Sequence, residues 1–281
     1  MTTSSTQPKG FYLTITEDEK SIKYPLFSHV SDWSKGITSS SPNNTDITLN
    51  YSIGGPIQLD FLTSKTPKYN YKFHEILNKT ISFTVDVSNV PHNHNFAFYT
   101  SALTSGETYK DAQSVDSRTE IDLMEANNMA YHFTAHKRFD KGGNLTMGIG
   151  GVIQKWNKPT NKFTSMTTLP PEQLYGINKY IDTRLPFRVS VTITPTSIKL
   201  LLKQNGKHIW QQMGGPYLDS LLPEIQGKKH VLICSLWYGE MSWLSGGLPV
   251  PDESAIEKNV KATISDISIT SIKPTTVSNE L

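Results

Sequence analysis

Hydrophobic and polar residues alternate along much of the chain with the period of two that is typical of β-strands. The clearest segment is Ile81–Ser88, where one side consists of Ile81, Phe83, Val85 and Val87 and the other side is entirely polar. A strand of this kind has one face in a hydrophobic core and the other in water. Similar segments occur at Thr48–Ile53, Ile57–Leu62, Asn95–Leu103, Leu145–Ile149, Pro186–Thr194, Ser197–Lys203 and Ala262–Ile269.

His230–Tyr238 is apolar on both faces for most of its length, which predicts a central strand. Helical pattern is limited to two short candidates, Pro171–Gly176 and Tyr217–Leu222. About ten strands separated by turn signals predict an all-β fold with two antiparallel sheets packed as a sandwich. No internal repeat or long linker divides the chain, so we expect one domain at 11–272, between a flexible N-terminus at 1–10 and a C-terminal tail at 273–281.

The 281-residue chain has a formal net charge of +2 and no block of lysine or arginine, so we expect no binding to nucleic acid or to a membrane. Its only cysteine, Cys234, excludes an internal disulfide and lies among apolar residues, which predicts a buried thiol. The N-terminus has no recognisable signal peptide. We therefore expect a cytoplasmic or non-classically released protein, while secretion stays open if a signal was trimmed. The oligomeric state also stays open.

The densest group of functional side chains lies in Thr119–His136, where Glu120, Asp122 and Glu125 occur within six residues. In a regular strand Glu120 and Asp122 point to one face and Glu125 to the other. A β-bulge between Asp122 and Glu125 would add one residue and return Glu125 to the first face. The alternative is a surface helix, because four apolar residues have roughly helical spacing: Leu123, Ala126, Met129 and Ala130. The surrounding strands favour the bulged strand.

Carboxylates gathered on one face can cleave a glycosidic bond. Retaining glycosidases hold two carboxyl groups roughly 5–5.5 Å apart beside the scissile bond. One attacks the anomeric carbon, while the other protonates the leaving oxygen and then activates water. A third carboxyl between them, such as Asp122, can hydrogen-bond the nucleophile. Like charges this close also raise the pKa of one member of the group.

Four blocks of the sequence resemble glycoside hydrolase family 7, the cellobiohydrolases and endoglucanases that act on β-1,4-glucans. Glu120–His136 is similar to the active-site segment of that family, E-x-D-x-W-E-A-N followed by T-x-H, with Met124 in place of the tryptophan. The other blocks are Leu77–Pro91, Tyr175–Val191 and Val231–Leu244, in the order of the family. The resemblance implies a concanavalin-like β-jelly-roll sandwich whose concave face holds a glucan chain.

The resemblance also implies a role for each matching residue. Glu120 corresponds to the nucleophile, Asp122 to its assisting carboxyl and Glu125 to the acid/base. It also implies three substrate-binding residues. His136 corresponds to a histidine on the leaving-group side of the cleft, and Trp237 and Trp243 correspond to two sugar-stacking platforms. No metal or other cofactor is expected, because the spacing of the histidines fits no zinc site.

The segment between Leu103 and Glu120 is short, where the family has a long insertion that covers the cleft. An open cleft is expected as a result, and it suits cleavage inside an oligo- or polysaccharide chain. The predicted function is a retaining, endo-acting β-glucan hydrolase, or a transglycosylase of the same mechanism. The shortened loops and missing disulfides leave a second hypothesis open, a non-catalytic, lectin-like carbohydrate-binding protein. A third hypothesis is a β-sandwich protein that functions only by binding other proteins.

Overall fold

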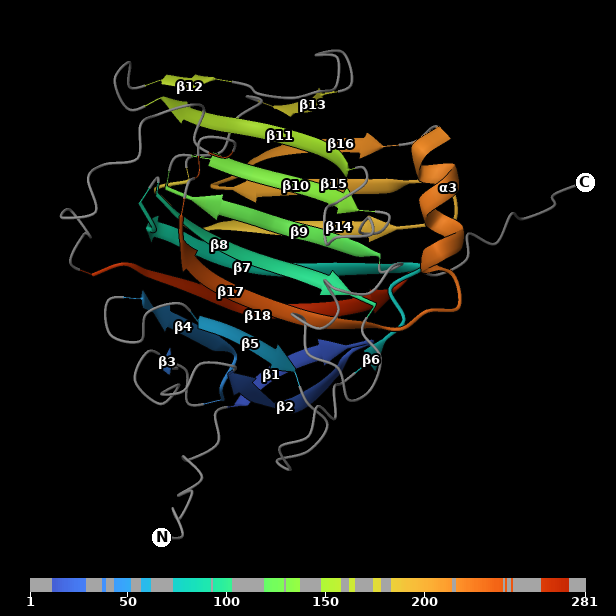
Figure 1. Ribbon diagram of the computed structural model, residues 1–281, viewed down its shortest axis with the longest axis horizontal. Coiled ribbons are helices and arrows are strands. Elements are labelled where there is room, and N and C mark those ends of the chain that lie inside the picture. The colour runs from blue at the N-terminus through green and yellow to red at the C-terminus, as the bar shows by residue number, and fades with distance from the viewer. Residues whose placement is uncertain are drawn as a thin grey trace, which may run out of the picture.

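The computed structural model describes residues 12–28, 37–38, 43–51, 57–61, 73–91, 93–102, 119–128, 130–136, 148–157, 162–164, 174–177, 183–213, 216–239, 241, 244 and 259–272. These residues form two sheets, A and B, which pack face to face (Figure 1). The predicted all-β sandwich of two antiparallel sheets is confirmed.

Sheet A has the strand order β13–β16–β15–β14–β7–β18, and β18 then pairs with β4 over one part of its length and with β1 over another. All of its neighbours are antiparallel except β1 and β18, which pair parallel. The strands of sheet A are β1 (Tyr12–Glu17), β2 (Lys20–Ser28), β3 (Ile37–Thr38), β4 (Asp46–Asn50), β7 (Lys79–Asn89), β13 (Leu174–Ile177), β14 (Phe187–Ile193), β15 (Ile198–Gln204), β16 (Lys207–Met213) and β18 (Lys261–Ser271).

Sheet B faces the viewer in Figure 1 and has the order β12–β11–β10–β9–β8–β17, followed by β5 and β6 along β17. The long strand β2 pairs with β1 in sheet A and with β5 in sheet B, so it joins the two sheets. The other strands are β5 (Ile57–Phe61), β6 (Phe73–His74), β8 (His94–Ser101), β9 (Glu120–Asn127), β10 (Ala130–His136), β11 (Gly148–Asn157), β12 (Lys162–Thr164) and β17 (His230–Tyr238). One helix, α3 (Pro216–Ile225), lies beside an end of the sandwich.

The core between the sheets follows the alternation of the sequence. In β7 the four predicted apolar residues, Ile81, Phe83, Val85 and Val87, are all fully or almost fully buried. The Phe83 ring in sheet A meets the Phe98 ring of sheet B edge to face, with centroids 4.8 Å apart. Cys234 is also buried in this core, as predicted. This packing fixes the inner face of sheet B and leaves its other face for the functional side chains.

One histidine is buried between β8, β9 and β17. His230 is fully buried, and its Nδ1 and Nε2 lie 3.2 and 3.4 Å from the hydroxyl oxygens of Thr100 and Thr119. Burial, helped by the charge of Lys228, lowers the pKa of His230 from 6.5 to about 3. The fold therefore holds this imidazole in its neutral form.

Two local predictions have opposite outcomes. The helix expected at Tyr217–Leu222 is confirmed within α3. The helix expected at Pro171–Gly176 is wrong over its described part, because Leu174–Ile177 form strand β13, with Tyr175 paired to Trp210 of β16; residues 171–173 lie outside the described residues. Pairing with a neighbouring strand outweighs a short, weak local preference for helix.

Candidate active site

Strand β9 carries the three predicted acids, and its pairing with β8 shifts within it. The consecutive residues Phe98 and Tyr99 of β8 pair with Met124 and Asp122 of β9, so Leu123 has no partner of its own. The register with β10 shifts over the same stretch. One extra residue in the middle of three paired strands is a β-bulge. The bulge predicted between Asp122 and Glu125 is present, and the surface-helix alternative is wrong.

The bulge changes which residues of β9 face the core, because the alternation of inward and outward side chains shifts by one residue beyond it. Leu123 and Met124 are consecutive, yet both are fully buried in the core between the sheets. Alternation then resumes with Ala126 in the core, which places Glu125 on the opposite face together with Glu120 and Asp122. All three acids therefore share the outer face of sheet B.

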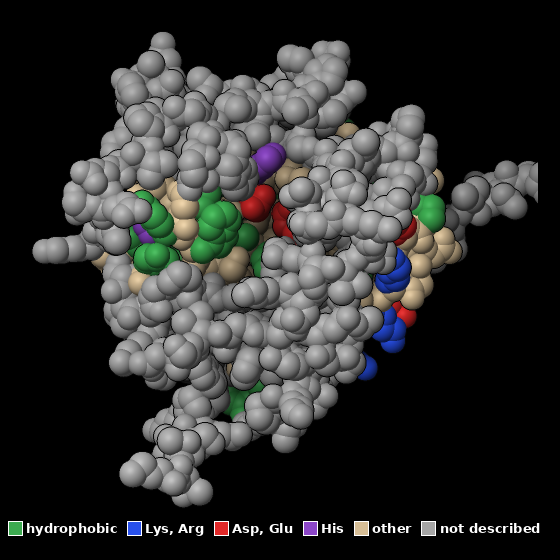
Figure 2. Space-filling view, in the orientation of Figure 1, with side chains coloured by type: hydrophobic (Ala, Val, Ile, Leu, Met, Phe, Trp, Pro, Cys, Tyr) green, Lys and Arg blue, Asp and Glu red, His purple; other side chains and the backbone are tan. Residues whose placement is uncertain are grey.

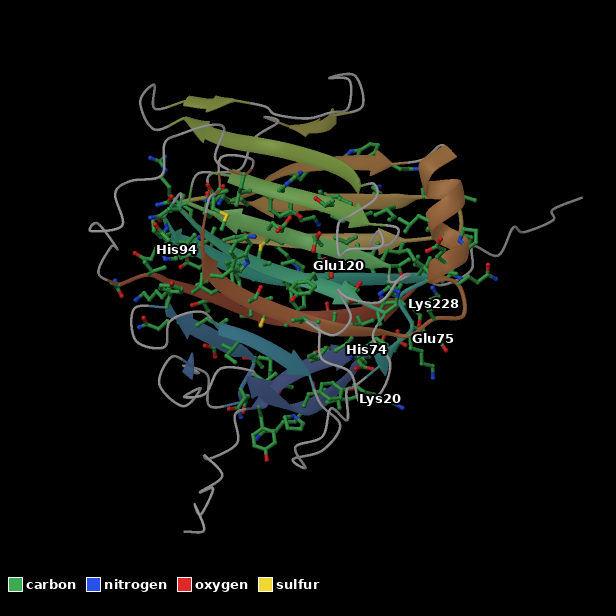
Figure 3. The ribbon with its side chains drawn as sticks, viewed as in Figure 1. Lys20, His74, Glu75, His94, Glu120 and Lys228 are labelled. Atoms are coloured by element: carbon green, nitrogen blue, oxygen red, sulfur yellow. The ribbon has the colours of Figure 1, made fainter. Side chains whose placement is uncertain are left out.

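Residues opposite the acids on the neighbouring antiparallel strands share that face. Tyr99 and Thr134 lie opposite Asp122, in the middle of the group. The positions opposite the two glutamates are Ser101 and His136 for Glu120, and Ala97 and His132 for Glu125. Figure 2 shows acidic side chains and a histidine close together near the middle of this face, and Figure 3 labels Glu120 over the central strands of sheet B.

Asp122 is the acid whose charge state the fold changes most clearly. Its side chain is buried, and burial raises its pKa from 3.8 to about 7. A carboxyl with this pKa keeps its proton through the acid range. It can therefore donate a hydrogen bond to a neighbouring carboxylate.

The pKa values of Asp122 and His230 predict opposite effects of pH on stability. The folded protein keeps the Asp122 proton up to about pH 7 while the unfolded chain loses it near 3.8, so this residue makes stability fall as pH rises through that window. The folded protein rejects a proton at His230 down to about pH 3 while the unfolded chain takes it near 6.5, so this residue makes stability fall as pH drops. Within its pH window, each residue changes the free energy of unfolding by up to about 1.4 kcal/mol per pH unit.

The two effects oppose each other between about pH 4 and 6.5, so single variants separate them. In Asp122→Asn we expect the free energy of unfolding to rise more steeply with pH than in the wild type, because only the His230 effect remains. In His230→Asn it should fall as pH rises. Urea unfolding at half-unit steps from pH 3.5 to 7.5 measures both slopes. Equal slopes in the two variants would contradict these pKa shifts.

Glu125 is held by an amide from the neighbouring strand. Its Oε1 accepts a hydrogen bond of 2.9 Å from Nδ2 of Asn95, and Asn95 is itself fully buried. A carboxyl oxygen that accepts this bond is not the one that carries a proton. The contact therefore directs the proton of Glu125 to Oε2.

The predicted substrate-binding residues are described to different degrees. His136 lies opposite Glu120 by register, at the end of β10, and its side chain is outside the described residues. Trp237 is half-buried and pairs with Asn95, so it lies on the same face as the acids. A Cβ added at Gly239 would come within 3.2 Å of the Trp237 ring, which shows that this glycine makes room for the ring. Trp243 lies outside the described residues.

Asn95 and Tyr99 lie on the face of the acids, but the sequence did not single them out, whereas Thr134 is the threonine of the T-x-H motif. The alternation within Asn95–Leu103 would have placed Asn95, Tyr99 and Ser101 on one face. Only the pairing of β8 with β9 shows that this face is the one with the acids. Nearby on β9, the side-chain amide of Asn127 donates a hydrogen bond of 3.2 Å to the backbone carbonyl of His94 on β8.

Among the described residues, no group of three or more His, Cys, Asp or Glu side chains is placed to hold a metal ion. No helix in the described part of the chain has the length and apolar character needed to cross a membrane.

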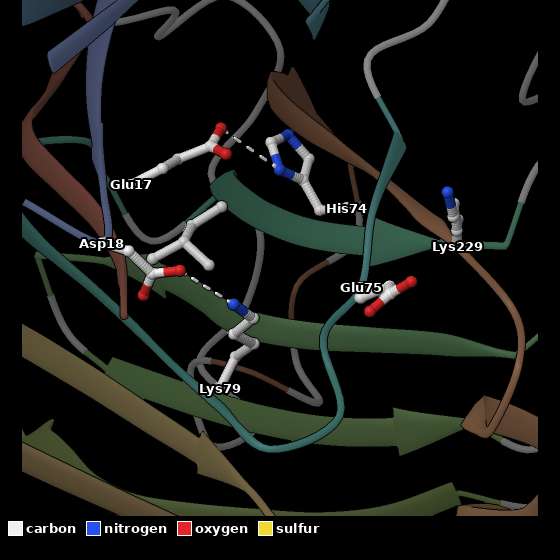
Figure 4. A pocket seen from close by; sticks show the side chains of 7 residues that line it. Glu17, Asp18, His74, Glu75, Lys79 and Lys229 are labelled. Carbon is white, nitrogen blue, oxygen red and sulfur yellow. Dashed lines mark hydrogen bonds and ion pairs between the residues drawn. The ribbon is translucent and has the colours of Figure 1, made fainter. Parts of the chain in front are cut away.

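A cavity of about 230 Å³ lies where the two sheets meet, away from the acids (Figure 4). His74 Nδ1 of β6 lies 3.4 Å from Glu17 Oε1 of β1. Asp18, in the turn after β1, accepts hydrogen bonds from the backbone N–H of Ser271 and from Lys79 Nζ, the latter at 3.1 Å, and these bonds lower the pKa of its carboxyl. These contacts link β6 of sheet B to β1, and β1 to β7 and β18. We interpret the residues that line this cavity as a structural junction that holds the two sheets together.

Comparison with known proteins supports the fold alone. No family model and no curated protein matches the sequence. An endoglucanase I complexed with cellobiose superposes with a TM-score of 0.69 and 14% identity, over 94% of this chain and 97% of the other. A family 7 cellobiohydrolase from Daphnia pulex gives 0.65 and 13%, over 95% and 98%. A cellobiohydrolase from Melanocarpus albomyces complexed with cellotetraose gives 0.65 and 13%, over 94% and 96%. The chain has the β-jelly-roll sandwich fold of glycoside hydrolase family 7 enzymes, as the sequence resemblance implied.

Proposed function

We propose that the protein is a retaining glycoside hydrolase that cleaves β-1,4-linked glucan, or a related polysaccharide, within the chain. The observation that carries the proposal is the bulge in β9, which brings Glu120, Asp122 and Glu125 to one face of sheet B. A regular strand with the same sequence would direct Glu125 into the core. Keeping three acids together on a largely buried face costs electrostatic free energy, and that cost is typical of catalytic sites.

Glu120 is the nucleophile of this proposal. Its carboxylate attacks the anomeric carbon and forms a covalent glycosyl-enzyme intermediate while the leaving oxygen departs. Asp122 keeps its proton because burial raises its pKa to about 7. Its role in the proposal is to donate a hydrogen bond to Glu120, which would hold the attacking oxygen in place. Water then attacks the intermediate and releases Glu120. Two inversions at the same carbon retain the configuration of the sugar.

Glu125 is the acid/base. It gives its proton from Oε2 to the leaving oxygen in the first step and takes a proton from water in the second. Trp237, on the same face, offers a flat surface for the C–H face of a sugar ring. His136 and Trp243 complete the proposed substrate-binding set.

The choice of substrate rests on the structural neighbours. Two proteins with the same fold form complexes with cellobiose and with cellotetraose, which are β-1,4-linked glucose chains. The short segment between Leu103 and Glu120 favours an open cleft and therefore internal cleavage.

The test is reducing-sugar release from a panel of soluble β-glucans, with solution viscosity as a measure of internal cleavage. Proton NMR follows the anomer that forms first. We expect an early fall in viscosity and a product in the β configuration. An α product would contradict the double displacement. Glycan binding without sugar release, unchanged when both glutamates are replaced, would instead support the lectin-like function.

The hydrogen bond from Asn95 to Glu125 gives a second prediction. Asn95→Ala removes a donor that favours the ionised carboxylate, so the pKa of Glu125 rises and the alkaline limb of kcat/KM moves to higher pH. Without this bond the carboxyl is less firmly positioned for proton transfer, and such misplacement lowers kcat by up to roughly 100-fold. The pH profile on a soluble β-glucan measures both effects. Asn127→Ala is the matched control, because its amide binds a backbone carbonyl, and it should leave the alkaline limb in place.

A further inference from the structure

The outer face of sheet A, on the opposite side of the sandwich from the acids, has an unusual distribution of charge over β14, β15 and β16. The buried side chains of β15 are at even positions, so its odd positions face outward, and pairing extends that face to both neighbours. The nine outward positions are Arg188, Ser190 and Thr192 on β14, Lys199, Leu201 and Lys203 on β15, and His208, Trp210 and Gln212 on β16. Four of these side chains are basic and none is acidic.

Three of the basic residues lie in one row across the strands. Arg188 pairs directly with Lys203, and Lys203 pairs directly with His208. Like charges directly opposite one another in a sheet are destabilising, and Arg188 and Lys203 form such a pair. The described residues provide no carboxylate for any of the three, and Arg188 reaches only the Thr84 hydroxyl, at 3.4 Å. A bound anion would relieve this repulsion.

A hollow lies at the end of this row. It has a volume of about 330 Å³ and is lined by Lys203, Gln204, Asn205, Gly206 and His208. The turn at Asn205 and Gly206 has positive φ angles of 49° and 75°, as a tight two-residue hairpin requires. A Cβ added at Gly206 would meet nothing within 4 Å, so the space above the turn is open. Two of the three basic residues of the row therefore border an open hollow.

An aromatic side chain lies beside the row. Trp210 is two residues from His208 on the same face of β16, a separation of roughly 7 Å along a strand. Its ring is half-buried, and Lys199 Nζ lies 4.6 Å from the ring centroid. A flat ring next to several cations suits a ligand that has both a sugar ring and a negative group.

We propose that this basic-aromatic face, Arg188, Lys199, Lys203, His208 and Trp210, binds an anionic polysaccharide. The carboxylate or sulfate groups of the chain lie over the row from Arg188 to His208 and in the hollow, and one sugar ring stacks on Trp210. The cationic row and the anionic chain are complementary in charge. A nucleic acid is the less suitable partner, because the net charge is only +2 and the row is short. The site does not depend on the activity proposed for the opposite face.

The experiment compares Lys203→Glu with Lys20→Glu, which makes the same change of charge at an exposed position on β2 (Figure 3). Isothermal titration uses polygalacturonate, dextran sulfate and uncharged dextran, and the stronger of the two anionic ligands identifies carboxylate or sulfate as the recognised group. We expect Lys203→Glu to weaken binding roughly tenfold or more, as the loss of a charged hydrogen bond would. Lys20→Glu and Glu120→Gln, a change on the opposite face of the sandwich, should bind these anionic ligands like the wild type.

Trp210→Ala should also weaken binding, with its thermal unfolding followed to confirm a folded sample. Trp210→Phe keeps an aromatic face and should recover part of the affinity. Equal binding by Lys203→Glu and Lys20→Glu would overturn the proposal, as would equal affinity for uncharged dextran. Tighter binding of polyuridylate that also depends on Lys203 would overturn it in favour of a nucleic-acid site.

Discussion

Glu120→Gln is expected to lower kcat on a soluble β-glucan on the order of 10³-fold or more, because a neutral amide cannot form the glycosyl-enzyme intermediate. The substitution keeps the size and shape of the side chain at a position that is only 5% exposed. It also removes one negative charge from a face on which three acidic side chains lie close together. We therefore expect the folded state to be at least as stable as in the wild type, so that only turnover is lost.

Steady-state release of reducing sugar measures the effect, and urea unfolding verifies the fold. Glu75→Gln is the matched control, since Glu75 is exposed, lines the cavity between the sheets and lies away from the acids. It should keep wild-type activity. Full activity in Glu120→Gln would remove Glu120 from the mechanism, whereas loss of activity in both variants would indicate a general effect of charge.

Much of the fold could be predicted from the sequence because alternation is a local property. The apolar residues of β7 and the two-residue period of β14 and β15 each indicate which face is buried without reference to any partner. β13 shows the limit of this reasoning. Its four residues form a strand only because β16 offers a free edge, and β16 follows more than 25 residues later in the chain.

The candidate site could be predicted where it depends on a single strand. The spacing of Glu120, Asp122 and Glu125 requires an extra residue if they are to share a face, and the bulge at Leu123 provides it. Asn95 could not be found in this way, because its contact with Glu125 depends on the register of β8 against β9. The raised pKa of Asp122 likewise comes from burial by several strands.

Glu125→Gln is expected to lower kcat roughly 10²- to 10⁴-fold on a natural glucan, the usual contribution of a general acid. The size of the loss should depend on the leaving group. A sugar hydroxyl is a poor leaving group and needs the proton from Glu125, whereas a dinitrophenolate leaves without protonation. With a dinitrophenyl cellobioside the first step should therefore stay fast. The second step should become slow, because the amide cannot activate water.

Stopped-flow measurement should show a burst of dinitrophenolate equal to the enzyme concentration, followed by slow turnover. Added azide, a nucleophile that needs no general base, should restore turnover and give a β-glycosyl azide. Glu120→Gln is the internal contrast, because it forms no covalent intermediate and should show neither burst nor rescue. A burst in Glu120→Gln, and none in Glu125→Gln, would exchange the roles of the two glutamates while leaving the bulged strand as the centre of the site.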